Sequence, residues 1–333
     1  MLCRSWFILG GSLVLLLGVP AFASAGIRSA STAADQTGRT CASQAATTYR
    51  LIKEPQAGYR PIYQFISAAR HTLDMTMYSL VDPKATAALS AAAERGVTVR
   101  VLLDSSSNGG AGGRATNAPA YKTLRAHGVN VRWSWSGVLW HQKSIVRDGR
   151  AVCIMTGNLY APYYSVLRDF AVVADNAATV AGVEATLQTD FTHNHRPPAK
   201  GVVPRGSELI WSPGAQDRLV KLIGTARPGS TLFAEDEQLA SPAIEQALVA
   251  AAKRGVTANL TMTASSDWQA GFDTLVAGGV HVNLYPANAP LYIQSKGLSV
   301  NASPESVQAQ RHRHEVRLQG LGPGGCGSAR SVA

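Results

Sequence analysis

The sequence predicts a duplicated α/β fold, in which two lobes each carry a mixed sheet covered by helices on both faces. Three observations lead to this prediction. A heptapeptide occurs twice, helical and strand patterns alternate around each copy, and the chain of 333 residues exceeds the ~100–200 residues of an average domain. Because 46% of the residues are hydrophobic, each lobe can bury a core of its own.

The repeat extends well beyond the heptapeptide itself. Ala92 to Thr98 recurs as Ala251 to Thr257, with a single difference at Glu94 and Lys253. The flanking segments repeat in the same order, which makes duplication a better explanation than coincidence. The matched flanks are Ile66–Ala69 with Ile223–Ala226, Asp82-Pro83 with Ser241-Pro242, and Leu124–Val129 with Leu275–Val280.

Each copy is predicted to alternate helices and strands. The apolar run at 97–103 lacks a clean alternation, which suits a strand buried on both faces. Alternating elements with Gly-Val entries to the strands predict a mixed sheet with helices on both sides. The segment Ser105–Asn117 is rich in Ser, Gly and Asn and is predicted to be a surface loop. In the first copy, helices are expected at 61–71, 83–95 and 121–127, and strands at 72–78, 97–103 and 129–133.

The first residues have the layout of a secretory signal. Arg4 precedes an apolar run from Trp6 to Val19, and small residues follow at Ala23-Ser24-Ala25. We expect cleavage near Ala25 and a secreted protein, extracellular or periplasmic. The predicted organisation is a signal peptide at 1–25, a flexible segment at 26–50, a first lobe at 51–192, a linker at 193–206, a second lobe at 207–301 and an irregular tail at 302–333.

Charge and cysteine content narrow the partners and the type of fold. The net charge of +10 favours anionic partners such as phospholipid surfaces, nucleic acid or free phosphates, without choosing among them. Cys41, Cys153 and Cys326 follow the predicted signal peptide. Because three is an odd number, at most one disulfide forms among them and a disulfide framework is excluded.

One cluster of residues carries the chemistry. His141 and Lys143 lie two residues apart before a predicted strand, so their side chains project to the same face. An imidazole beside an ammonium group suits a phosphate, because the nitrogen attacks phosphorus while the cation neutralises charge on the oxygens. Asn158 adds a neutral donor. A carboxylate on the far imidazole nitrogen would hold the attacking nitrogen unprotonated.

The spacing of these residues resembles the signature of the phospholipase D superfamily. The pattern runs His-x-Lys-x4-Asp, from His141 to Asp148, and continues with Gly157-Asn158 and Arg168-Asp169-Phe170. The resemblance implies two similar α/β lobes that meet at one active site. It also implies that His141 is the nucleophile, that Lys143 and Asn158 bind phosphate, that Asp148 is a structural third member and that Asp169 orients the nucleophile. This chemistry requires no metal or other cofactor, and the sequence has no Cys/His cluster at zinc spacing.

The second lobe departs from the pattern of the family. A duplicated member normally supplies a second His-x-Lys-x4-Asp motif, but here Gln294 stands in the histidine position and Asn301 in the aspartate position. Only Lys296 remains. A glutamine can hold a phosphate oxygen but cannot deliver a proton to a leaving group. We therefore predict that Gln294 and Lys296 bind substrate, and that the group that would protonate the leaving oxygen is missing.

A second alignment of this region competes with the first. Leu298–Ser303 could instead correspond to the Gly-Ser-x-Asn element of the family, and Arg313-His314-Glu315 to its Arg-Glu pair, if residues after Lys296 are absent. A deletion or frameshift near Gln294 would explain this end of the chain. The two alignments exclude one another.

Three functions remain open at this point. The first is a secreted phosphodiesterase that hydrolyses or transfers phospholipid head groups through a phosphohistidine at a membrane surface, and the second is a secreted nuclease with the same chemistry. The third is an inactive paralogue that binds anions. Aromatic residues around the motif favour a lipid substrate, although aromatic rings also stack on bases. They are Trp133, Trp135, Trp140, Tyr160, Tyr163 and Tyr164.

Overall fold

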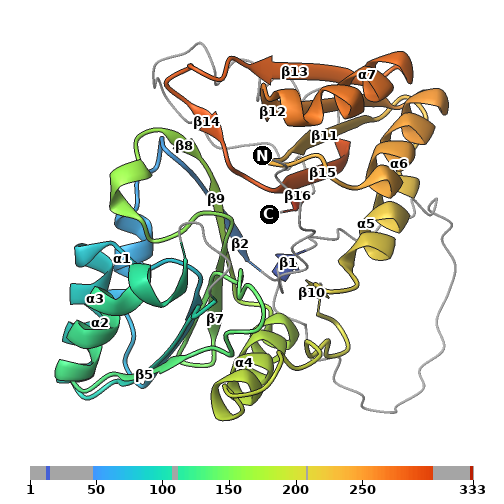
Figure 1. The fold of residues 1–333 in the computed structure, drawn as a ribbon. Helices are drawn as coiled ribbons and strands as arrows, with labels where there is room; N and C mark the ends of the chain where they lie inside the picture. The colour runs from blue at the N-terminus through green and yellow to red at the C-terminus, as the bar shows by residue number, and fades with distance from the viewer. Residues whose placement is uncertain (1–12, 16–47, 107–111, 208, 303–330, 333) are drawn as a thin grey trace, which may run out of the picture.

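The computed structural model describes residues 13–15, 48–106, 112–207, 209–302 and 331–332. Two α/β lobes lie side by side, the first built mainly from residues 49–192 and the second from residues 209–302 (Figure 1). No helix in the described part of the chain is long and apolar enough to cross a membrane. A short strand β1, Leu13–Leu15, pairs with β10, Leu209–Trp211. β1 belongs to the predicted signal peptide, whose cleavage stays a prediction.

The first lobe is built on a seven-stranded mixed sheet with the order β2-β9-β7-β6-β3-β4-β5. Strands β3, β4 and β5 are parallel, and the remaining neighbours are antiparallel. Because parallel strands end at the same edge, the loops after β3, β4 and β5 meet there. The strands are β2 Tyr49–Lys53, β3 Thr72–Met77, β4 Thr98–Leu103, β5 Asn130–Trp133, β6 Ser144–Arg147, β7 Ala151–Met155 and β9 Phe170–Ala174.

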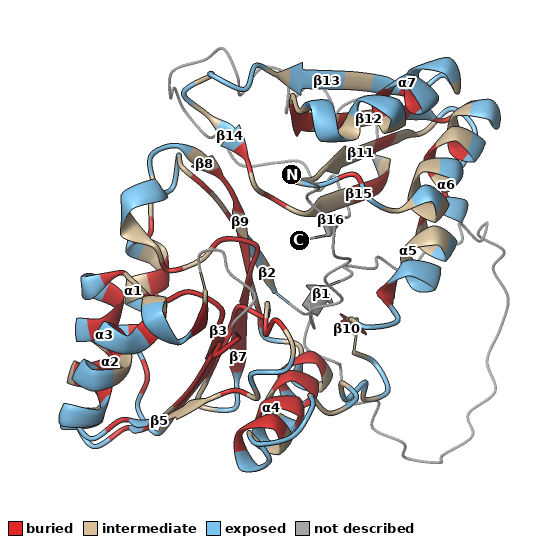
Figure 2. Cartoon of the chain, in the orientation of Figure 1, coloured by how far each residue is buried: buried red, intermediate tan, exposed pale blue. Residues whose placement is uncertain are grey.

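Helices cover both faces of this sheet, as expected from the sequence. One face packs on α1, Arg60–Ser67, α2, Pro83–Glu94, and α3, Gly113–Ala126, and the other on α4, Ala177–Thr192. The central strands are buried and the outward faces of the helices are exposed (Figure 2). Burial on both faces explains the apolar run of β4.

The second lobe repeats the central topology of the first. Its sheet has the order β13-β12-β11-β15-β16, with β11, β12 and β13 parallel and β15 antiparallel to β11. Among the described residues its helices pack on one face only, in a single apolar cluster. The elements are α5 Ala215–Gly224, β11 Thr231–Glu235, α6 Pro242–Lys253, β12 Thr257–Thr263, η2 Ser266–Trp268, α7 Gln269–Ala277, β13 His281–Tyr285, β15 Gly297–Ala302 and β16 Ser331–Val332.

The two lobes are joined by backbone pairing as well as by the chain itself. A short strand of the first lobe, β8, Leu167–Arg168, pairs in parallel with β14, Tyr292–Ile293, of the second. The Arg168 carbonyl also accepts the N–H groups of Gln294 at 3.2 Å and Ser295 at 2.8 Å. These bonds place the segment Gln294–Lys296 directly beside the first lobe.

One sequence prediction needs correction here. Helix α3 begins at Gly113, not at Tyr121, so the end of the predicted Ser105–Asn117 loop is helical. The reason is Asn117, which is fully buried and whose amide bonds Leu80 N, Tyr78 O and Asp104 O at 2.8–3.1 Å. The segment predicted to link the lobes, 193–206, contacts α4, since Ala199 N and Val202 N donate to side chains of that helix.

Asp148 and Asn301 show how closely the lobes correspond. Both have a left-handed backbone, with φ of 55° and 59°, at the end of equivalent strands. The Asp148 carboxylate accepts the N–H groups of residues 70–72 at 2.7–3.2 Å, before β3. Asn301 Oδ1 accepts Arg227 N at 2.8 Å, before β11. This correspondence follows the alignment that pairs Gln294 with His141, whereas Arg313-His314-Glu315 of the other alignment lie outside the described residues.

We predict that Asp148→Ala lowers the free energy of unfolding by about 1–3 kcal/mol, because three backbone donors lose their acceptor. Asp148→Asn should cost less, since asparagine accepts one such bond and tolerates a positive φ, as Asn301 does. Urea unfolding of both variants measures the difference. Equal losses for the two variants would contradict the assigned cap.

Candidate active site

The loop that carries His141 is anchored at the carboxyl end of β4. Asp104 is fully buried there and accepts Trp140 N at 2.8 Å. The second lobe uses the same device, because Thr263 Oγ1 at the end of β12 accepts Ile293 N at 2.9 Å. Each anchored residue immediately precedes the position of interest, His141 or Gln294. The two lobes therefore present these two positions in equivalent ways.

The two lysines repeat this equivalence in their side chains. Lys143 Nζ donates to the carbonyl of His141 at 2.9 Å, and Lys296 Nζ donates to the carbonyl of Gln294 at 2.6 Å. Burial, followed by the charge of Lys296, lowers the pKa of Lys143 to about 7. The charge of Lys296 in the second lobe thus acts on Lys143 in the first. A phosphate anion between them would relieve their repulsion.

His141 lies beside Lys143 and against the ring of Tyr78. Burial lowers the pKa of His141 well below its usual value, and the positive charges of Lys143 and Lys296 lower it further. Its ring meets the Tyr78 ring edge-on, with centroids 4.6 Å apart. A histidine with such a pKa is neutral near pH 7, so one ring nitrogen keeps a free lone pair. This is the state that nucleophilic attack requires.

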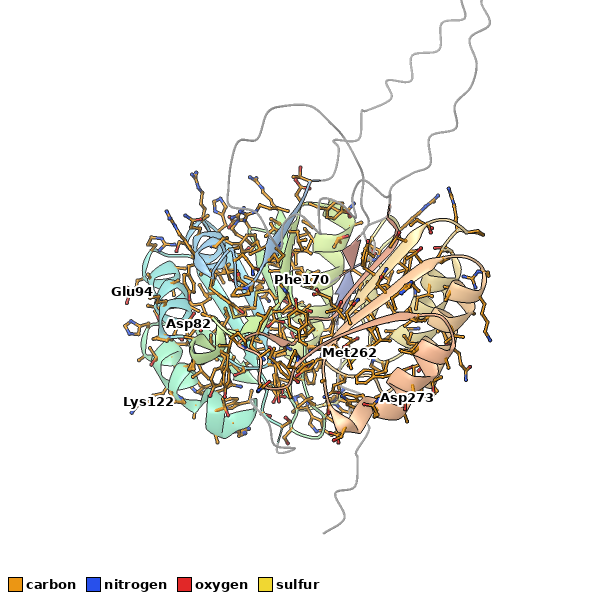
Figure 3. The ribbon with its side chains drawn as sticks, turned by 90° about the horizontal axis from the view of Figure 1, so that it is seen from above. Asp82, Glu94, Lys122, Phe170, Met262 and Asp273 are labelled. Carbon is orange, nitrogen blue, oxygen red and sulfur yellow. The ribbon has the colours of Figure 1, made fainter. Side chains whose placement is uncertain are left out.

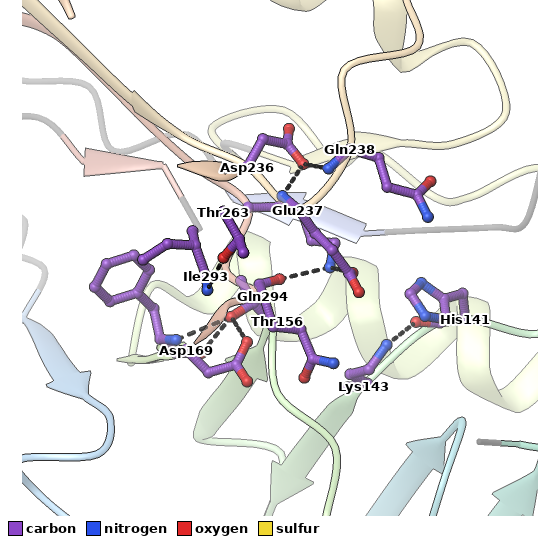
Figure 4. A network of polar contacts seen from close by, with 12 residues as sticks. His141, Lys143, Thr156, Asp169, Asp236, Glu237, Gln238, Thr263, Ile293 and Gln294 are labelled. Carbon is purple, nitrogen blue, oxygen red and sulfur yellow. Dashed lines mark hydrogen bonds and ion pairs between the residues drawn. The ribbon is translucent and has the colours of Figure 1, made fainter. Parts of the chain in front are cut away.

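Asp169, which the resemblance predicts to orient the nucleophile, forms no hydrogen bond with His141 among the described residues. Its carboxylate accepts Thr156 Oγ1 at 2.7 Å, while Oδ2 is buried without a partner among the described residues. Figure 4 shows Asp169 and His141 on opposite sides of the site. The neighbouring carbonyl of Arg168 holds the backbone of Gln294, so Asp169 belongs to the side of the site that carries Gln294. Burial raises the pKa of Asp169 to about 6.

Gly157 explains the tight packing around Asp169. A Cβ atom there would lie 2.7 Å from the Tyr59 hydroxyl and 3.0 Å from Asp169 Cγ. Any larger residue would push these groups apart. Asn158, next in the chain, is half-buried with its Oδ1 unpartnered in the described structure. Because Oδ1 accepts hydrogen bonds, the phosphate contact predicted from the sequence would have to come from Nδ2.

The second lobe adds two carboxylates that sequence reasoning missed. Glu237 forms an ion pair with Lys296, and Asp236 accepts the N–H groups of Glu237 and Gln238 at 2.8 and 3.3 Å (Figure 4). By the strand register, Glu237 occupies the position that Tyr78 holds in the first lobe. Extending the repeat as far as this position would have identified it. Burial raises the pKa of Asp236 to about 6.

Asp148, Gln294 and Lys296 complete the residues singled out from the sequence. Asp148 follows β6 whereas His141 and Lys143 precede it, so Asp148 lies at the opposite end of that strand. Gln294 is half-buried, and its Oε1 has no partner in the described structure. No group of three or more His, Cys, Asp or Glu that could hold a metal ion occurs among the described residues.

Most of the aromatic residues near the motif do not form a rim around the site. Trp140 is buried against Leu102, and Tyr164 stacks on Tyr59. Trp133 stacks on Tyr121 along β5. Of the aromatic residues named from the sequence, Tyr163 is the most exposed, at 47%. The predicted apolar entrance therefore shrinks to a few residues, because Trp140 and Tyr164 pack within the first lobe and Trp133 and Trp135 line the groove along β5.

Comparison with known proteins identifies the first lobe. Residues 62–191 match the family model described as "Cardiolipin synthase, PLD-like domain". This part of the chain is a PLD-like domain, which supports the resemblance to the phospholipase D superfamily. Members of this superfamily are phosphodiesterases. The matched segment contains both His141 and Lys143, together with Asn158 and Asp169. No curated protein sequence matches the chain.

Solved structures add similarity at the level of the fold. Polyphosphate kinase from Porphyromonas gingivalis is 15% identical, with a TM-score of 0.52, over 76% of this chain and 43% of that chain. The phospholipase D family member Nuc from Salmonella typhimurium is 22% identical, with a TM-score of 0.41, over 46% of this chain and 99% of that chain. NucT from Helicobacter pylori is 16% identical, with a TM-score of 0.38, over 44% of this chain and 96% of that chain.

The charges of the site predict a distinct pH profile. Since kcat/KM reports the free enzyme, it should fall above pH 7, where Lys143, with its pKa of about 7, loses its proton. On the acid side, protonation of His141 should lower kcat/KM only well below pH 6.5. The decline of kcat should start at higher pH, because bound phosphate keeps the ammonium group protonated.

Rates with a nitrophenyl phosphodiester across pH 4–10 measure this profile. Lys143→Arg serves as the control, because a guanidinium stays protonated and should move the alkaline decline to higher pH. An alkaline decline that is the same in both proteins would assign it to another group.

Proposed function

We propose that the chain is a phosphodiesterase that works through a covalent phosphohistidine on His141. The observation that carries the proposal is the half-buried imidazole of His141, which packs edge-on against Tyr78 beside Lys143 and whose pKa is lowered by burial and by the charges of Lys143 and Lys296, one from each lobe. The two cations bind the phosphate monoanion and stabilise the additional charge that develops on its oxygens. We also propose that the protein acts after export, on the basis of its N-terminal residues.

The reaction proceeds in two displacements. The free nitrogen of His141 attacks phosphorus, a P–N bond forms, and the P–O bond to the alcohol breaks with its electron pair on the departing oxygen. Water or another alcohol then attacks phosphorus, loses its proton and releases His141. Gln294 has no proton to transfer at either step, so the first leaving oxygen takes its proton from solvent.

The lipid substrate expected from the sequence has limited support. Tyr163, Val166 and Tyr292 are exposed, and the backbone bond from Tyr292 to Val166 places two of them side by side at the β8–β14 junction. This small apolar patch suits a phospholipid head group presented at a membrane surface. A nucleic-acid substrate is favoured by a different surface, formed along β5.

We predict that His141→Ala lowers turnover of a nitrophenyl phosphodiester by more than about 10³-fold while thermal unfolding changes little. The loss follows from the missing covalent step. Quenching the wild-type protein during turnover with alkaline denaturant should trap phosphorus on a histidine, because the P–N bond survives alkali and is lost in acid. His127→Ala, an exposed histidine of the same lobe, is the matched control and should retain the wild-type rate. Equal rates in the two variants would end the proposal.

Gln294→His tests the missing proton donor. A positioned acid contributes ~10²–10⁴ in rate, so the substitution should accelerate cleavage of alkyl phosphodiesters, whose alcohols leave poorly. Nitrophenyl esters should gain little, because their leaving group departs without a proton. Gln294→Asn, which provides no acid, is the control. If the ratio of the alkyl to the nitrophenyl rate is the same in both variants, position 294 is not that of the missing proton donor.

A further inference from the structure

A groove of about 740 Å³ runs along β5, outside the catalytic site. β5 is the last strand of its sheet, on the side of the first lobe away from the second (Figure 1). Arg114, Arg125 and Arg132 line the groove together with Tyr121, Trp133 and Trp135. None of the described residues that line it is acidic. Three cations and three aromatic rings therefore share one concave surface without a carboxylate.

The aromatic and basic residues of the groove form an ordered stack. Trp133 and Tyr121 are parallel within 5°, with centroids 4.3 Å apart. The Arg114 guanidinium lies 5.1 Å from the Trp133 centroid, and that of Arg125 lies 6.0 Å from the Tyr121 centroid. The rings thus hold the two exposed arginines in place without neutralising them. A guanidinium plane fixed in this way can stack on a base and still donate to phosphate.

One end of the groove lies close in the fold to the catalytic loop. Ser134, which lines the groove, accepts Ser105 N on its hydroxyl at 3.1 Å and Ser105 Oγ on its carbonyl at 2.5 Å. Ser105 follows Asp104, the residue that anchors the chain before His141. The groove and the site therefore share the edge of the sheet where β3, β4 and β5 end.

We propose that this groove binds single-stranded nucleic acid and holds it so that a neighbouring phosphodiester reaches His141. The arginines supply the attraction for the backbone, and the guanidinium planes at the two ends of the stack supply stacking surfaces for bases. A lipid surface would need exposed apolar side chains, and this groove offers polar and charged ones. The inference rests on the proposed phosphodiesterase only for the cleavage step, since binding is a property of the groove itself.

Binding is tested with the full chain carrying His141→Ala, so that the probe stays intact. The probe is a fluorescently labelled oligodeoxynucleotide of 20 bases, followed by anisotropy over a series of salt concentrations. Arg114→Ala with Arg125→Ala should weaken binding by roughly tenfold at 0.1 M salt and reduce the slope of log affinity against log salt by about 1.4. Both residues are exposed, so folding should be retained.

The matched control removes two cations of the same lobe outside the groove, with Lys84→Ala and Lys122→Ala. Both lysines are exposed, and Lys122 points outward from the first lobe (Figure 3). This variant should bind the oligonucleotide within twofold of the parent. Equal losses in the two double variants would reduce the effect to net charge and overturn the proposal. Unchanged binding in the arginine variant would overturn it as well.

Two further measurements separate the groove from its alternatives. Binding to phosphatidylglycerol vesicles is measured in a sedimentation assay. If the arginine variant no longer binds vesicles but still binds the oligonucleotide, the groove is a lipid-binding surface instead. In the active protein, the arginine variant should raise KM for the oligonucleotide and leave nitrophenyl diester turnover unchanged. If no diester is cleaved but binding depends on the arginines, the phosphodiesterase fails and the groove stands.

Discussion

The pairing of β8 with β14 is the interaction on which the active site depends. It is only two residues long on each side, yet it is the point where the second lobe is hydrogen-bonded to the first. It holds the segment Gln294–Lys296 beside the first lobe; burial lowers the pKa of His141 and of Lys143, and the Lys296 ammonium lowers both further. A neutral nucleophile beside a cationic phosphate site therefore follows from how the lobes are joined. Neither lobe alone contains both charges.

The repeat made the two-lobed fold and the position of Gln294 predictable, because strand register and turn residues recur with the heptapeptide. Asp148 and Asn301 illustrate this, since they cap equivalent turns with the same backbone conformation. The partner of Asp169 could not be predicted, because it depends on which lobe approaches that carboxylate in space. The early start of α3 was also hidden, since the composition around Asn117 is that of a loop and only burial shows why its amide is needed.

The aromatic residues show why proximity in sequence misled the choice of substrate. Trp133 and Trp140 lie seven residues apart around the same motif. One packs into the core beside Leu102, and the other belongs to a stack with Tyr121 on the outer edge of the sheet. A strand and a loop direct neighbouring rings to different places, so composition near a motif does not define the entrance to a site. The charges along β5 are a better guide, because they are exposed together.

The second lobe keeps the hydrogen-bonding frame of the site and loses its proton chemistry. Gln294 is held by backbone contacts that would also hold a histidine. Lys296 donates to the carbonyl of Gln294 as Lys143 does to that of His141, and Asn301 preserves the turn. Glu237, in the position of Tyr78, pairs with Lys296 and takes up part of its charge. An entering phosphate must therefore compete with a carboxylate for this lysine, whereas Lys143 forms no ion pair among the described residues and lies 5.2 Å from the centroid of the Tyr78 ring. Because the pair is partly exposed and flexible side chains form it, the exchange costs little, and Lys296 is suited to accept a phosphate that Lys143 already holds.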